Sequence, residues 1–171
     1  TAIAGPFWVK NVLQFSARDI ALASFWAGVP WTLKMLFGQF VDARPIMGSP
    51  RRAYIFLGAS CVALGYLILA CLAGKLSFVT NMAPPLTIFF MAAVVMAVGF
   101  VLQDITADAM TAEMNTGDER DARSIQTLGR IALSIGGLTG AFLAGTVAAI
   151  GREHSYAVVY IIALCVPLIS I

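Results

Sequence analysis

The feature that most constrains this chain is a series of long apolar runs that hold almost no charge. The run Tyr54–Ala73 contains no charged residue at all. Of the 171 residues, 60% are hydrophobic and 12% are charged, whereas a soluble domain usually carries about 25% charged residues. Since too few polar residues remain to cover a water-soluble globule, the runs indicate segments that cross a membrane.

Five runs approach the length of about 20 residues that a helix needs to cross the hydrocarbon core. In lipid every backbone group must be satisfied internally, which favours helices, and the alternation typical of a β-barrel is not seen. We therefore predict an all-α integral membrane protein, a six-helix bundle whose first and last helices are incomplete. The predicted spans are 1–15 (partial), 20–40, 54–73, 85–104, 125–150 and 155–171 (partial). The abrupt ends, at Thr1 and inside the last apolar run, lead us to expect a piece of a longer protein.

Several function classes find no support in the residues. The net charge of +2 is too small to indicate nucleic-acid binding. Cys61, Cys71 and Cys165 lie singly in apolar runs, and His154 is the one histidine, so we expect neither a disulfide nor a metal site. No nucleophile–histidine–acid set, HExxH, P-loop or GxGxxG motif occurs. We predict no enzyme activity and no cofactor.

The loops alternate in charge. Assuming the predicted spans, one side of the membrane holds five arginines and the other holds four basic residues, which places the hinge loop (residues 41–53) on the cytoplasmic side or its equivalent. The five are Arg44, Arg51, Arg52, Arg120 and Arg123. On the span 125–150, Gly136, Gly137, Gly140 and Gly145 form a small-residue pattern, and we expect this face to pack against another helix.

Charged residues inside the spans are the candidates for function, because they are costly in lipid. Lys34 lies about 12 Å deeper than Asp42 at about 1.5 Å per residue, and it follows Pro30 and Trp31, where the helix is expected to bend. Lys34 either extends to the interface or faces the bundle interior, where it would pair with a carboxylate or an anionic ligand.

Asp104 and Asp108 are one helical turn apart and share a face, so they need a nearby cation. Lys34, Arg44 and Arg130 are the candidates. Two roles stay open for the two carboxylates: structural ion pairing, or proton coupling through a raised pKa.

The hinge sequence "GQFVDARPIMGSPRR" resembles the loop between the second and third helices of the major facilitator superfamily. The resemblance rests on Gly38, Asp42 and Arg44, then Gly48, Arg51 and Arg52. It implies that the chain is the amino-terminal half of a twelve-helix protein, and that this set acts as a conformational latch whose ion pairs exchange when the bundles rock.

The wider stretch Gly28–Gly58 and the acidic segment Gln103–Glu113 are similar to the folate–biopterin transporter family. That family has a Pro-Trp-x-x-Lys-Pro run, and here Met35 stands in place of the second proline. The resemblance implies a secondary transporter of a small, folate-like anionic solute. Lys34 and Trp31, with Asp104 and Asp108, are then the expected solute or coupling-ion residues. Expected partners are the lipid bilayer, the solute and the carboxy-terminal bundle of the same protein.

A second hypothesis is a non-transporting protein of this fold that serves as a subunit or assembly factor of a larger membrane complex, such as a pigment–protein complex. Photosynthetic assembly factors related to the superfamily are similar to the chain as well.

Overall fold

A computed structural model of the protein describes residues 15–44, 51–76, 81, 83–114, 119–149 and 155–169. All regular structure within these ranges is helical. The helices are α2 (Ala17–Thr32), α3 (Lys34–Ala43), α4 (Arg52–Ala73), α6 (Pro85–Met114), α7 (Glu119–Ala149) and α8 (Ser155–Ile169). The predicted first span lies outside the described residues except for its last position.

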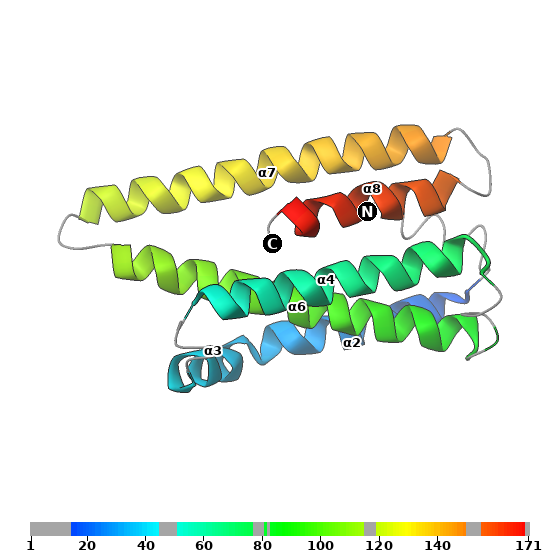
Figure 1. Ribbon diagram of the computed structural model, residues 1–171, viewed down its shortest axis with the longest axis horizontal. Helices are drawn as coiled ribbons and strands as arrows, with labels where there is room; N and C mark the ends of the chain where they lie inside the picture. The colour runs from blue at the N-terminus through cyan, green and yellow to red at the C-terminus, as the bar shows by residue number, and fades with distance from the viewer. Residues whose placement is uncertain are drawn as a thin grey trace.

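The long helices lie side by side in the order α7, α8, α4, α6, α2 (Figure 1). Helix α4 is central, because it packs against α6 on one side and α8 on the other. The larger core cluster joins these three helices through residues such as Val62, Ala92 and Tyr160. A smaller cluster of Val41, Tyr54 and Leu102 joins α3, α4 and α6.

Helices α4 and α6 are each long and apolar enough to cross a membrane, and α2 with α3 make a third crossing if the bent pair is counted as one span. The apolar parts of α7 and α8 are shorter, at Thr127–Leu143 and Ala157–Pro167. The predicted class, an all-α membrane protein, is confirmed. Helix α6 continues past the predicted end of its span at residue 104 as far as Met114, so it carries its acidic residues on a regular helix.

The predicted span 20–40 is broken in two at Leu33, where α2 and α3 meet at 43°. Pro30 has no N–H to donate within α2. In the same turn the Thr32 hydroxyl donates to the Val29 carbonyl at 2.8 Å, and the Leu33 N–H donates to that same carbonyl at 3.2 Å. Helix α2 thus ends at Thr32, two residues after the proline and close to the predicted bend.

The tightest helix contact is the crossing of α4 and α6, and three glycines make it. A Cβ built on Gly99 would lie 2.6 Å from the Gly58 carbonyl oxygen, and one built on Gly58 would lie 2.8 Å from the Gly99 carbonyl oxygen. Gly65 is covered in the same way by Met96 and the Ala92 carbonyl. The two backbones therefore meet directly, as small residues permit in membrane helices.

The glycines of α7 face open space within the described part of the chain. A Cβ built on Gly136, Gly137, Gly140 or Gly145 would meet nothing within 4 Å. Helix α7 contacts α8 and α6, with no close approach at these four positions. Packing of the glycine face against a neighbouring helix is therefore not found within the described part of the chain, and it stays a prediction.

These contacts predict opposite effects for two glycine-to-alanine changes. Gly99→Ala should destabilise the protein by about 1–3 kcal/mol, because the new methyl group overpacks the crossing. Gly136→Ala should be neutral or stabilising, since alanine favours a helix over glycine by about 1 kcal/mol. Thermal unfolding of the purified full-length protein in detergent measures both. Equal melting temperatures for the two variants would contradict the crossing.

Candidate functional site

Two ion clusters connect α3 to α6. The first, the Lys34 cluster, consists of Lys34 on α3 with Asp104 and Asp108 on α6. The Lys34 Nζ lies 2.5 Å from Asp104 Oδ2 and 2.8 Å from Asp108 Oδ2. The lysine therefore relieves the repulsion between two carboxylates one turn apart. With one cation against two acids, the cluster keeps an excess negative charge.

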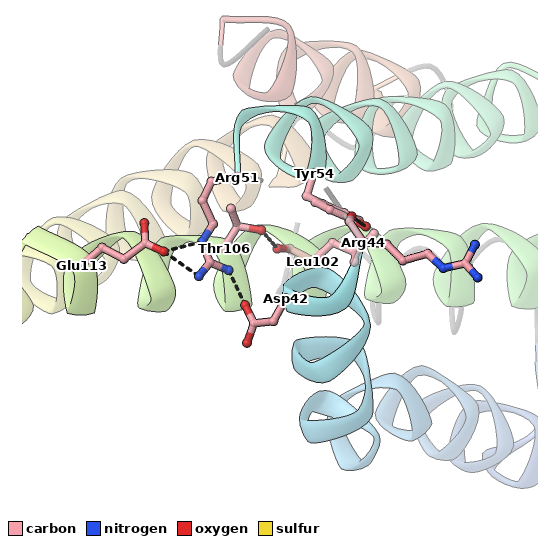
Figure 2. Close-up of polar contacts among 7 residues, drawn as sticks. All are labelled: Asp42, Arg44, Arg51, Tyr54, Leu102, Thr106 and Glu113. Atoms are coloured by element: carbon pink, nitrogen blue, oxygen red, sulfur yellow. Dashed lines mark hydrogen bonds and ion pairs between the residues drawn. The ribbon is translucent and has the colours of Figure 1, made fainter. Parts of the chain in front are cut away.

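The second, the Arg51 cluster, consists of Arg51, Asp42 and Glu113 (Figure 2). Arg51 Nη1 lies 2.5 Å from Asp42 Oδ1, while Nη2 and Nε lie 2.7 Å and 3.0 Å from Glu113 Oε1. The Arg51 side chain is 17% exposed, whereas Asp42 and Glu113 are 63% and 57% exposed. The hydrogen bonds to Glu113, and then to Asp42, raise the pKa of the Arg51 guanidinium, so it stays charged as it bridges the end of α3 to the end of α6.

Both clusters lie at the same end of the bundle, where α3 ends and α4 begins. Gly58 of α4 lies opposite Gly99 and Gln103 of α6, and the two helices are antiparallel. At about 1.5 Å per residue, the start of α4 is then roughly level with Asp108. The Lys34 cluster is therefore near the end of the apolar part of α4 and not at its middle.

The other residues predicted for the solute site and the latch are not members of the two ion clusters. Trp31 is exposed on α2, and Gly38 faces Ile105 of α6, where an added Cβ would make an ordinary contact at 3.8 Å. The Arg44 side chain extends away from Asp42 (Figure 2), and Arg52 opens α4. Gly48 lies outside the described residues.

Of the three cations considered for the aspartates, the structure brings Lys34 to them. Arg130 is exposed on α7, and neither it nor Arg44 forms an ion pair within the described part of the chain. No group of three His, Cys, Asp or Glu side chains in the described segments is arranged to hold a metal ion.

Two residues of this region were not assigned a role from the sequence. Glu113 pairs with Arg51, although it projects from α6 on roughly the opposite side from Asp104 at about 100° per residue. Tyr54 is buried and its hydroxyl donates to the Arg44 carbonyl oxygen at 2.6 Å. One signal in the sequence could have indicated the pairing of Glu113: it lies on the same predicted side of the membrane as the hinge arginines. No such signal exists for Tyr54, which stands at the start of the apolar run 54–73.

The Lys34 cluster predicts that removal of the lysine is worse than removal of the whole cluster. Lys34→Met should lower the stability by about 1–3 kcal/mol, because it leaves two carboxylates without their charged donor. The triple variant Lys34→Met, Asp104→Asn, Asp108→Asn should recover much of that loss. Thermal unfolding in detergent at neutral pH compares the two, and a triple variant as unstable as the single one would contradict the ion pairing.

Comparison with known proteins shows which family the chain resembles. The model described as the BT1 family matches residues 2–171. The chain is 28% identical over 143 residues to "Probable folate-biopterin transporter 2" of Arabidopsis thaliana, covering 84% of this chain and 27% of that protein. It is 24% identical over 170 residues to "Folate-biopterin transporter" of Synechocystis sp., covering 99% and 32%. The chain thus spans between about a quarter and a third of the length of these relatives. No solved structure gives a significant match.

Proposed function

The chain belongs to the BT1 family, and from this premise we propose that it forms part of a secondary transporter that moves a small organic solute across a membrane by alternating access. The curated relatives it matches are named folate-biopterin transporters. The all-α membrane fold and the resemblance of the hinge loop to the major facilitator superfamily support the same proposal.

The observation that carries the proposal is the attachment of α3 to α6. Helix α3 follows a 43° break at Leu33. An ion cluster links each of its ends to α6, and between them Val41 packs in an apolar cluster with Leu102 of α6. Ion pairs between exposed groups are weak and exchange readily. Helix α3 is short, it follows a bend in the chain, and ion pairs hold both of its ends. Such a helix is suited to move between two positions.

We assign the gate to the Arg51 cluster and its surroundings, on the cytoplasmic side or its equivalent. Asp42 and Arg51 carry the ion pair, while Gly38, Arg44, Gly48 and Arg52 complete the latch that the resemblance implies. Opening toward that side requires Arg51 to release Asp42 or Glu113, because the two acids belong to different helices.

We assign the solute or the coupling ion to the Lys34 cluster, with Trp31 on the preceding turn. An organic anion such as a folate-like or pterin-like solute would have to compete with Asp104 and Asp108 for Lys34, because both carboxylates already contact its ammonium group. Protonation of a displaced carboxylate would balance the charge of such an exchange, so solute binding and proton uptake are coupled at this cluster in the proposal.

Uptake of radiolabelled folate by the full-length protein in vesicles tests the function. Lys34→Ala should abolish uptake without loss of protein from the membrane, since it removes the cation of the cluster. Arg18→Ala is the matched control, because Arg18 is an exposed basic residue of α2, the helix that precedes α3 in the bent pair. This variant should retain uptake. Unchanged uptake by Lys34→Ala would remove Lys34 from the site.

The same preparation separates transport from a scaffold role. If the wild-type protein takes up no folate or pterin and purifies with a stoichiometric membrane partner, the subunit or assembly-factor hypothesis replaces the proposal. Uptake by the protein alone excludes that replacement.

A further inference from the structure

Tyr54 lies at the junction of three helices, beside the Arg51 cluster. It is 1% exposed, and its ring packs with Val41 of α3 and Leu102 of α6. Its hydroxyl donates to the carbonyl oxygen of Arg44, the residue that caps the end of α3. Figure 2 shows Tyr54 reaching from the first turn of α4 to this carbonyl, on the opposite side of Asp42 from Glu113.

This hydrogen bond answers a specific need of α3. The last carbonyl groups of a helix have no donor within the helix, and a buried carbonyl without a partner is costly. The Tyr54 hydroxyl supplies a donor to one carbonyl at that end. It does so from the first turn of α4, whose N-cap residue is Arg51, so both attachments of the end of α3 start at the same end of α4.

The two attachments differ in how easily they break. Asp42 and Glu113 are more than half exposed, so water can replace their bonds to Arg51 at little cost. The Tyr54 side chain is 1% exposed and its bond to the Arg44 carbonyl is partly buried, so this contact is less open to water than the exposed ion pairs are. When the ion pairs open, the tyrosine therefore still holds the end of α3 near α4.

We infer that Tyr54 is a positioning residue of the gate: by anchoring the Arg44 carbonyl it keeps Asp42 within reach of Arg51, so that the ion pair re-forms in each cycle. This inference rests on the proposed function for the word gate, and on the observed contacts for the anchoring. Tyr54 touches neither the solute nor the Lys34 cluster in this proposal, so its effect is on the movement and not on solute affinity.

The anchoring is tested without any transport measurement. Spin labels are placed at Gln39→Cys on α3 and Leu64→Cys on α4, two exposed positions, in a full-length protein whose other cysteines are replaced. Tyr54→Phe removes the hydroxyl and keeps the ring, and it should broaden the distance distribution between the labels. Tyr66→Phe, which alters another buried tyrosine of α4, is the control and should leave the distribution narrow. An unchanged distribution in Tyr54→Phe would overturn the inference.

The role in the gate is tested by kinetics. Tyr54→Phe should lower the maximal uptake rate about three- to tenfold, the size expected for one buried hydrogen bond, with an unchanged KM for the solute. In an Arg51→Gln background the same change should have little further effect, because both residues hold one junction.

A purely structural role would give the opposite pattern. The gate role would be overturned if Tyr54→Phe lost folded protein but kept normal uptake per folded molecule. It would also be overturned if the rate effects of Tyr54→Phe and Arg51→Gln simply multiplied in the double variant. If the wild-type protein itself shows no uptake, the proposed function fails, while the label distances still decide whether Tyr54 anchors α3.

Discussion

Charged groups close to a lipid bilayer must be paired, and this requirement shapes the whole hinge end of the protein. Helix α6 carries three carboxylates beyond its apolar part, and α3 and the start of α4 supply the two cations that meet them. Asp104 is the least exposed of the three, at 35%, so it is the carboxylate that is most costly to leave unpaired. The pairing therefore helps to hold the short helix α3 in place beside the apolar cluster of Val41, Tyr54 and Leu102, and it does so with interactions that can also exchange.

The position of those cations depends on how α4 lies on α6. Gly58, Gly65 and Gly99 let the two backbones meet directly, and this close crossing sets how far α4 extends toward the end of α6. Arg51 and Tyr54, at and just after the start of α4, are thereby brought to the last turn of α3 and to α6. In the proposed function, the close crossing of α4 and α6 is the fixed part against which α3 moves.

Much of this was available from the sequence. The apolar runs predicted the helices, and the run 54–73 matches α4 closely because an uncharged stretch in lipid has no alternative to a helix. The bend after Pro30 followed from the chemistry of proline. The pairing of Asp104 and Asp108 with a cation followed from their spacing, although three cations were candidates. Packing of the α7 glycine face stays a prediction, because a run of glycines indicates that close packing is permitted but does not say which helix is the neighbour.

What the sequence by itself determined is local: which stretches are helical and apolar, where the chain bends, and which charges need partners. Only the tertiary structure decided that Lys34 takes both aspartates, that Glu113 completes the Arg51 cluster, and that Tyr54 holds the end of α3. The reason is geometric, since each of these contacts joins residues on different helices. They depend on the angle at Leu33 and on the register of α4 against α6, and neither quantity can be read from the order of the residues.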